Sequence, residues 1–132
     1  MTEQDNVRIV QKVYEAFSRD DHAAILDTLA DRFEWHHRGA PLVPWGRSRY
    51  TKEEVRSFFG ELQEAVEVLG LEIQRYVAQD DTVVTLGTFK GRSRKTGKEF
   101  DDPWAMVWML KDGKIRSFRA YEDTQAISTA CR

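Results

Sequence analysis

The hydrophobic pattern of this chain changes its period near Ala65, and that change limits the possible folds more than any other feature. Before Ala65, apolar residues recur mainly at helical spacing, and after it they alternate with a period of two. The expected order is helix, helix, strand, helix and then four consecutive strands. This order is typical of the α+β class, in which a curved antiparallel sheet carries its helices on one face.

The helical part of the pattern predicts three helices. The first extends from Val7 to Ser18 and is amphipathic. Asp20 and Asp21 can cap a second, shorter helix. A short strand around Trp35 and a proline-containing loop over residues 39–49 follow. The residues 51–54, TKEE, match a capping box and open a third helix, whose inward side chains are Val55, Phe58, Phe59 and Leu62.

The second half of the chain predicts an antiparallel meander of four strands. These strands are residues 66–78, 82–92, 102–110 and 115–123. We expect the first of them to bend or bulge at Gly70. The turns between the strands are residues 79–81, residues 94–98 and the pair Asp112-Gly113, which is a strong two-residue hairpin pattern.

The strand over residues 102–110 is apolar on both faces. One face carries Trp104, Met106, Trp108 and Leu110, and the other carries Ala105, Val107 and Met109. An antiparallel sheet usually buries one face, so a second apolar face needs its own cover. No remaining segment can supply that cover. We therefore expect a homodimer through the outer sheet face, most simply with two-fold symmetry.

Size and charge narrow the class of protein further. A chain of 132 residues suits one domain, and a formal net charge of −2 gives no reason to expect a nucleic-acid partner. No segment approaches the roughly 20 apolar residues of a membrane span, and residues 1–6 lack the apolar core of a signal peptide. Cys131 is the single cysteine, which fits a reducing compartment. We expect a cytoplasmic protein that binds neither membrane nor nucleic acid.

The segment Phe33-Glu34-Trp35-His36-His37 holds the main candidate for catalysis. An imidazole among aromatic rings stays neutral because burial lowers its pKa, so His37 can accept a proton as a general base. The alternative is a core or rim histidine that is satisfied by a backbone group. His36 points to the opposite face, so the two rings cannot chelate one ion, and no H-x-x-x-H or cysteine cluster exists. We expect no metal and no cofactor.

Several aromatic and polar side chains are candidates for the walls of a small-molecule cavity. The candidate substrate-binding residues are Tyr14, Trp35, Phe58, Trp104, Met106, Trp108, Phe118 and Glu122. Core packing is the alternative for the aromatic members. Asp123 is a second catalytic candidate, as a base or as a residue that orients His37. We favour the alternative for Asp123, in which its side chain caps a turn or pairs with Arg119.

Several segments together resemble the nuclear-transport-factor-2-like superfamily, and most closely its SnoaL-like group. They are the first helix, the turn Arg19-Asp20-Asp21, the run Leu29-Ala30-Asp31 into the Trp35 strand, the helix at 53–59, and residues 112–124 with their Tyr121-Glu122-Asp123-Thr124 ending. The resemblance covers residues 1–132 as a single SnoaL-like domain. It implies a cone-shaped, cystatin-like α+β fold with three helices on the concave side of a curved antiparallel sheet.

The superfamily includes polyketide cyclases, ketosteroid isomerases and epoxide hydrolases, and this chain departs from two of these groups. By resemblance to ketosteroid isomerases, His37 stands where they have an aspartate base, Val13 replaces their tyrosine, and Met106 lies near the position of their protonated aspartic acid. By resemblance to limonene epoxide hydrolases, Ala120 replaces a carboxylate that activates water. Neither mechanism is therefore expected here, since a shared fold does not carry its function along.

Our first hypothesis is a cofactor-independent isomerase, cyclase or lyase. It would transfer a proton on a small apolar ligand that bears a carbonyl group or a ring, with His37 as the base. Two alternatives remain open. One is a non-catalytic protein that binds a small ligand in the same cavity. The other is a subunit-association protein of the same fold, whose interior is filled by side chains.

Overall fold

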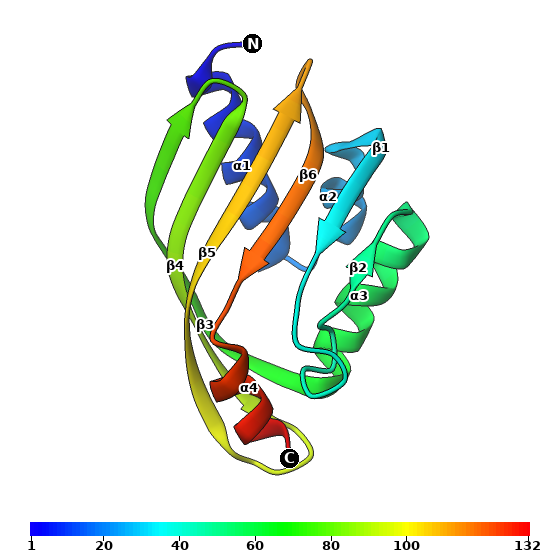
Figure 1. Ribbon diagram of the computed structural model, residues 1–132, viewed down its shortest axis with the longest axis vertical. Coiled ribbons are helices and arrows are strands. Elements are labelled where there is room, and N and C mark those ends of the chain that lie inside the picture. Colours follow the sequence, from blue (N-terminus) through cyan, green and yellow to red (C-terminus); the bar gives the residue numbers. More distant parts are fainter.

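Six strands form one curved sheet in the order β2-β1-β6-β5-β4-β3 in the computed structural model, which describes residues 1–132 (Figure 1). The strands are β1 (Leu29–His36), β2 (Ser48–Arg49), β3 (Val66–Gln79), β4 (Thr82–Ser93), β5 (Glu99–Lys111) and β6 (Lys114–Tyr121). Strands β3 to β6 form the predicted antiparallel meander, whereas β1 pairs in parallel with β6. The predicted α+β class is confirmed.

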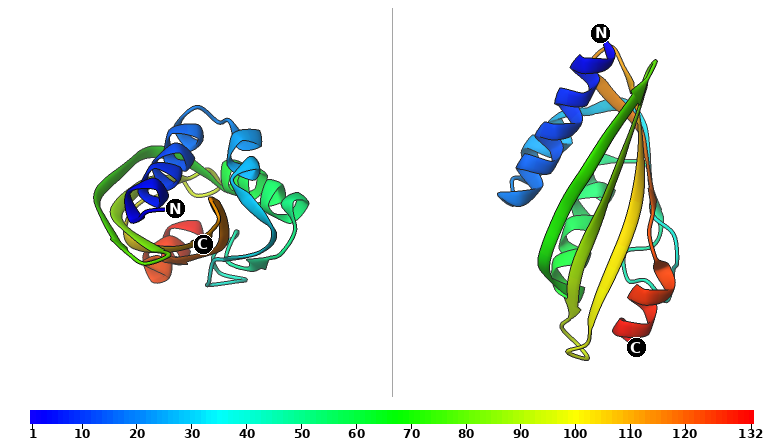
Figure 2. Two further views of the ribbon diagram at one scale, coloured as in Figure 1. Left: turned by 90° about the horizontal axis from the view of Figure 1, so that it is seen from above. Right: turned by 90° about the vertical axis from the view of Figure 1, so that its left-hand side faces the viewer.

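Three helices cover one face of the sheet, and a fourth lies near its far end. The helices are α1 (Glu3–Ser18), α2 (His22–Asp27), α3 (Lys52–Ala65) and α4 (Thr124–Cys131). Figure 2 shows the long strands curling around α1, α2 and α3, with α4 beside the β4–β5 hairpin at the C-terminal end of the molecule. The ends of β1 and β6 therefore lie between the helical layer and α4.

Side-chain caps explain where α1 and α3 begin. Thr2 and Asp5 form a reciprocal capping box, so α1 starts four residues before the predicted Val7. The Thr51 hydroxyl accepts the N–H of Glu54 at 3.1 Å, which confirms the predicted start of α3. The Glu54 carboxylate accepts the N–H of Tyr50 rather than that of Thr51, so only half of the predicted capping box forms.

Two predictions about the loops and the C-terminus need correction. Residues 48–49 were expected in a loop, but they form the short strand β2, which pairs with the end of β1. The last predicted strand, residues 115–123, ends at Tyr121, because Asp123 caps a helix that the sequence did not predict. Helix α4 has only two turns, so its apolar residues Ala126, Ile127, Ala130 and Cys131 repeat only once at helical spacing, which is too short a pattern to predict a helix.

Irregular pairing accounts for the curvature of the sheet. The pairing of β3 with β4 shifts between Val68 and Gly70, as predicted, and again between Ile73 and Arg75. On β4, a Cβ at Gly87 would lie 2.2 Å from the Glu72 carbonyl oxygen and 2.5 Å from the Trp104 ring. Only glycine allows the Trp104 indole to pack this closely on the strand, so Gly87 fixes one wall of the interior.

The two faces of β5 differ as the alternation predicts. Trp104, Trp108 and Leu110 are buried beneath the helices, whereas Ala105, Val107 and Met109 lie half-buried on the outer face. On the same outer face, Val77 is 48% exposed and Leu86 is 37% exposed. The sheet therefore presents apolar side chains on both sides. None of the helices combines the length and apolar character that a membrane span requires.

Candidate functional site

A cavity lies between the sheet and the helices α1, α2 and α3. Of its 17 lining residues, 15 are hydrophobic, and the two others are His37 and Glu122. The volume of the cavity that the centre of a water molecule can occupy is about 70 Å³. Because a single water needs roughly 10–15 Å³ on this measure, the interior is hollow and not filled by side chains.

The eight predicted substrate-binding residues all line this cavity. They come from α1, β1, α3, β5, β6 and the residue after β6: Tyr14, Trp35, Phe58, Trp104, Met106, Trp108, Phe118 and Glu122. Trp45, which is not among the predicted residues, also lines the cavity and is almost fully buried. It lies in the loop after β1, where no periodic pattern indicates the direction of a side chain.

Trp35 is the centre of the aromatic wall. Its ring centroid lies 4.2 Å from that of Phe118, 5.9 Å from that of Phe58 and 6.2 Å from that of Trp108. Tilted and edge-to-face contacts of this kind are favourable for aromatic pairs. The rings come from β1, α3, β5 and β6, so they hold the helical layer and the sheet together around the cavity.

The Tyr14 hydroxyl is already engaged by the protein. It lies 2.7 Å from Thr85 Oγ1 and 3.2 Å from the Met106 sulfur, and its ring stacks on Trp104 at 6.0 Å. Burial raises the pKa of Tyr14 well above its ordinary value. The phenol therefore stays neutral and serves as a wall, since its hydrogen-bonding capacity is met within the fold.

His37 follows β1 directly and points into the cavity, whereas His36 points away from it. The His37 ring is stacked on Phe58 with a centroid distance of 4.5 Å, and the residue is only 5% exposed. Its Nδ1 is buried and has no hydrogen-bond partner. Burial, with added repulsion from Arg49, lowers the pKa of His37 to about 3. The ring is therefore neutral and free to hydrogen-bond to a ligand.

Arg49 packs against Phe58, the ring on which His37 stacks. Its side chain is fully buried, donates to the Glu54 carbonyl at 2.9 Å and pairs with the Glu61 carboxylate. The guanidinium lies 5.5 Å from the centre of the Phe58 ring, on which His37 stacks. This role could not be predicted, because Arg49 ends the segment that we expected to be a loop.

A pair of carboxyl groups forms the second polar part of the site. Glu122 lines the cavity, and Asp102 on β5 is completely buried beside it. The two carboxyl groups are close enough for a hydrogen bond to form when one of them carries a proton. Burial raises the pKa of both groups, and for Glu122 the charge of Asp102 raises it further. The sequence analysis named Glu122 for the cavity but did not predict that Asp102 joins it.

Asp123 lies outside the cavity. Its side chain is exposed and accepts the N–H of Ala126 at 3.0 Å as the N-cap of α4. Its backbone N–H donates to Asp102 Oδ1 at 2.7 Å. The structure thus places the Asp123 carboxylate away from His37, in the capping role that we favoured as the alternative.

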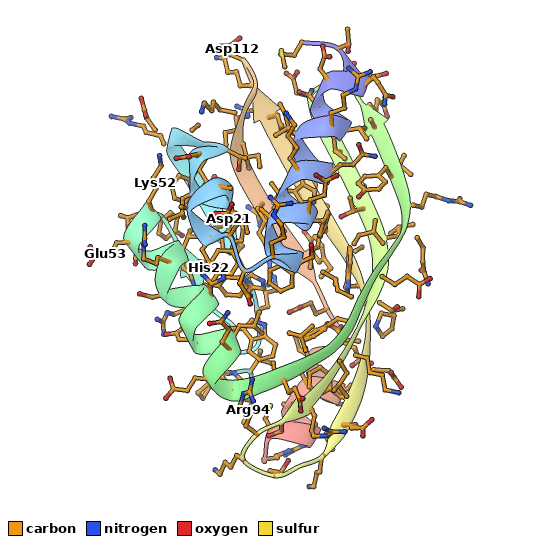
Figure 3. All side chains as sticks on the ribbon, turned by 180° about the vertical axis from the view of Figure 1, so that it is seen from behind. Asp21, His22, Lys52, Glu53, Arg94 and Asp112 are labelled. Atoms are coloured by element: carbon orange, nitrogen blue, oxygen red, sulfur yellow. The ribbon has the colours of Figure 1, made fainter.

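A surface groove adjoins the cavity between α1, α3 and β3. It offers about 730 Å³ on the same measure and shares five wall residues with the cavity: Tyr14, Phe17, Phe59, Leu62 and Leu71. His22, which also lines the groove, stacks on Phe59 with a centroid distance of 4.5 Å. Figure 3 shows this side of the molecule, with His22 labelled at the start of α2. The groove and the cavity are therefore neighbours that lie on either side of these shared side chains.

His36, the neighbour of His37 in the sequence, lies on the outer face, as predicted. His36 Nδ1 is 2.7 Å from Ser48 Oγ, and its Nε2 is 3.1 Å from Glu34 Oε1. His36 and His37 therefore do not approach a common point. No three histidine, cysteine or acidic side chains gather in an arrangement that could hold a metal ion.

Comparison with known proteins places the chain in a family. The family model of the SnoaL-like domain matches residues 10–118. No curated protein sequence matches significantly. The fold is similar to that of an NTF2-like protein from Burkholderia xenovorans LB400, which is 29% identical, with a TM-score of 0.91 over 100% of this chain and 99% of that chain.

Two more distant structures share the fold. One, provisionally named a SnoaL-like polyketide cyclase, comes from Mesorhizobium loti, with 21% identity, a TM-score of 0.71, and coverage of 87% of this chain and 97% of that chain. The other, provisionally named an isomerase, comes from Rhodopseudomonas palustris, with 16% identity, a TM-score of 0.77, and full coverage of both chains. Because the family model spans most of the sequence, this chain belongs to the SnoaL-like domain family of the NTF2-like superfamily.

Proposed function

We propose that this protein is a cofactor-independent enzyme of the isomerase, cyclase or lyase type. It would transfer a proton on a small apolar metabolite that bears a carbonyl group or a ring. One observation carries the proposal: an apolar, aromatic cavity contains a carboxyl group, Glu122, and an imidazole, His37, that has no protein partner. An imidazole nitrogen is costly to bury without a partner, so the position of His37 favours a ligand that engages it.

The two polar residues would have different roles. A proton-transfer group works best when its pKa lies near the working pH, and a positioned group contributes roughly 10²–10⁴-fold. The raised pKa of Glu122 meets this condition. His37, with its pKa lowered to about 3, is a weak base. We therefore assign proton transfer to Glu122, and to His37 the task of holding a ligand oxygen or hydroxyl as a neutral hydrogen-bond partner.

The walls favour a flat and largely apolar ligand. The indoles of Trp35 and Trp104 and the rings of Phe58 and Phe118 surround the space that Glu122 faces. Aromatic walls pack well against planar rings. A bicyclic ketone combines such a ring with a carbonyl oxygen and therefore suits the site as a test compound.

Deuterium exchange into 2-tetralone tests the proposal. The wild-type protein should accelerate exchange at the carbons beside the carbonyl above the rate in buffer, as followed by NMR. Glu122→Gln should reduce the acceleration by roughly 10²–10⁴-fold. Glu64→Gln, an exposed change on α3, is the matched control and should exchange like the wild type. Equal exchange with wild type and Glu122→Gln would contradict the proposed role of Glu122.

A non-catalytic binding protein is the second candidate. The buried indole nitrogens of Trp35 and Trp104 and the Nδ1 atom of His37 all lack protein partners, so the site could hold a ligand without changing it. In that case 2-tetralone would raise the melting temperature, because a ligand that binds only the native state stabilises it. No acceleration of exchange would accompany the binding.

We also propose that the outer sheet face pairs with a second copy of the chain. Val77, Val84 and Val107 form one cross-strand row over β3, β4 and β5, and Leu86 and Ala105 form part of the next row. A two-fold partner would cover both rows. Sedimentation should show a dimer at micromolar concentration, and Val107→Lys should give a monomer. A wild-type protein that sediments only as a monomer would contradict this proposal.

A further inference from the structure

We infer that Asp102 and Glu122 share a single proton at neutral pH, that Glu122 carries it, and that the site begins its work by donating this proton to the ligand. The inference rests on the proposed function for its chemical consequence, but the shared proton can be tested without any ligand. It also assigns a role to Asp102, which does not line the cavity. Asp102 is a positioning residue that acts through Glu122.

The hydrogen bonds around Asp102 favour its ionised form. Asp102 Oδ1 accepts the backbone N–H of Asp123 at 2.7 Å, and such a bond stabilises a carboxylate. Asp102 Oδ2 is buried and has no N–H or hydroxyl donor within reach. A fully buried carboxylate oxygen without a donor is costly. A proton on the neighbouring Glu122 carboxyl supplies that donor.

The surroundings of Glu122 favour its protonated form. Its neighbours in the cavity wall are hydrophobic apart from His37, which is neutral. The one donor from the protein is the Trp45 indole, whose Nε1 lies at a long 3.4 Å from Glu122 Oε2. With one weak donor and an apolar environment, Glu122 keeps its proton more readily than Asp102, and its pKa is raised more strongly.

No basic side chain opposes this arrangement. The charged group that acts on Asp102 from the start of α4 is Asp123, which repels a second negative charge. From the loop after β1, Trp45 contributes only its neutral indole. Two carboxylates without a cation nearby cannot both ionise cheaply in a buried site, as like charges in contact retain a proton between them.

The consequence concerns the order of proton steps. A site that rests with a carboxylic acid facing the ligand can first protonate a ligand oxygen. The Glu122 O–H bond breaks, an O–H bond forms on the ligand, and the Glu122 carboxylate then takes a proton from a carbon beside the protonated carbonyl. Protons balance, and no oxidant, reductant or water is consumed. The ligand class is therefore a ketone or enone with an accessible carbonyl oxygen.

Infrared spectroscopy of the whole protein tests the shared proton directly. A protonated carboxylic acid has a C=O stretching band that is separate from the carboxylate bands. We assign such a band at pH 7 to Asp102 and Glu122, because these two carboxyl groups are neighbours and burial raises the pKa of both. We expect one band in the wild type at pH 7, and we expect Glu122→Gln to abolish it.

Asp102→Asn separates the role of Asp102 from that of Glu122. Without the neighbouring charge, Glu122 should lose its proton at lower pH, with a midpoint roughly 1–3 pH units below that of the wild type. Asp101→Asn, an exposed change one residue earlier on β5, is the control and should leave the midpoint in place. An unchanged midpoint in Asp102→Asn would remove Asp102 from the proposal.

The wild-type spectrum alone can overturn the inference. If no protonated carboxyl band exists at pH 7, or if its intensity corresponds to two acids, the single shared proton is wrong. A band without any acceleration of 2-tetralone exchange would leave the shared proton in place and contradict the proposed function. Accelerated exchange without a band would support the function and overturn the shared proton.

Discussion

The cavity has two polar regions, the end of β1 with His37 and the junction of β6 and α4 with Glu122 and Asp102, and burial acts on them in opposite directions. At His37, desolvation removes a proton, because the charged imidazolium is the form that burial penalises. At the carboxyl pair, desolvation retains a proton, because the charged carboxylate is penalised. Only the carboxyl pair is left with a proton to exchange near neutral pH.

Burial alone therefore does not make a catalytic residue. Strands β1 and β6 run parallel and adjacent, so their ends present His37 and Glu122 to the same space. The first residue is locked in its neutral form across the physiological range. The second is brought into the range in which a group can both give and take a proton.

The largest difference should lie in the rate of proton exchange. Glu122→Gln should lower kcat for 2-tetralone exchange by roughly 10²–10⁴-fold, because it removes the transferring group. His37→Gln keeps a neutral hydrogen-bonding side chain and should cost about tenfold or less, mostly in KM, as expected for one neutral hydrogen bond. NMR exchange rates at several ketone concentrations measure both. A larger loss of kcat in His37→Gln than in Glu122→Gln would identify His37, and not Glu122, as the base.

The sequence predicts much of this site because strand alternation fixes the direction of a side chain. In the predicted last strand, residues 115–123, Glu122 shares a face with Phe118, and both side chains line the cavity in the structure. The pairing of Glu122 with Asp102 cannot be predicted in this way. Next to the hairpin, Leu110 of β5 pairs with Ile115 of β6. Between Leu110 and Met109 the pairing shifts by one residue, so that Ala105 pairs with Tyr121 and not with Ala120. A shift of this kind changes which residues of β5 lie beside the end of β6, and the sequence pattern does not predict it.

Segments without periodicity account for the other omissions. Trp45 lies in the loop after β1, and Arg49 ends the short strand β2. Their burial depends on contacts with Glu122 and with α3, which the local sequence does not indicate. The fold itself depends on long periodic segments, which is why α1, α3 and the meander were predictable. The residues that position His37 and Glu122 come from the short segments that connect these periodic segments.

Stability at acid pH should depend on His37. Its pKa is about 3 in the folded protein and about 6.5 in the unfolded chain. The unfolded state therefore binds the proton first as the pH falls below about 6.5, and the free energy of unfolding should decrease by up to about 1.4 kcal/mol per pH unit. His37→Gln should lack this contribution. Urea titrations of both proteins between pH 7.5 and pH 5 measure the difference, and parallel curves would contradict the burial of a neutral ring.

The carboxyl pair should give the opposite dependence. A raised pKa means that the folded state keeps a proton that the unfolded chain releases above the ordinary glutamate value of about 4.3. Stability from this group is full below that value and decreases as the pH rises toward the raised pKa, by at most about 1.4 kcal/mol per pH unit. Glu122→Gln should flatten this decline in urea titrations between pH 5 and pH 8. A decline as steep as that of the wild type would show that Glu122 ionises normally.

The smallest effect should come from Asp123, whose carboxylate caps α4 outside the cavity. Asp123→Ser keeps an N-cap oxygen and the backbone N–H to Asp102, so it should change the free energy of unfolding by less than about 0.5 kcal/mol, whereas Asp123→Ala should lose about 0.5–2 kcal/mol. The charge of Asp123 is the smallest of the influences on the pKa of Asp102, and neither change removes a group that contacts Glu122, so exchange of 2-tetralone should stay within about twofold of the wild type. The contrary result is that Asp123→Ser keeps full stability and loses as much exchange activity as Glu122→Gln. That result would identify Asp123 as the carboxylate that transfers the proton. The difference between the end of β1 and the β6–α4 junction would then not depend on the burial of Glu122.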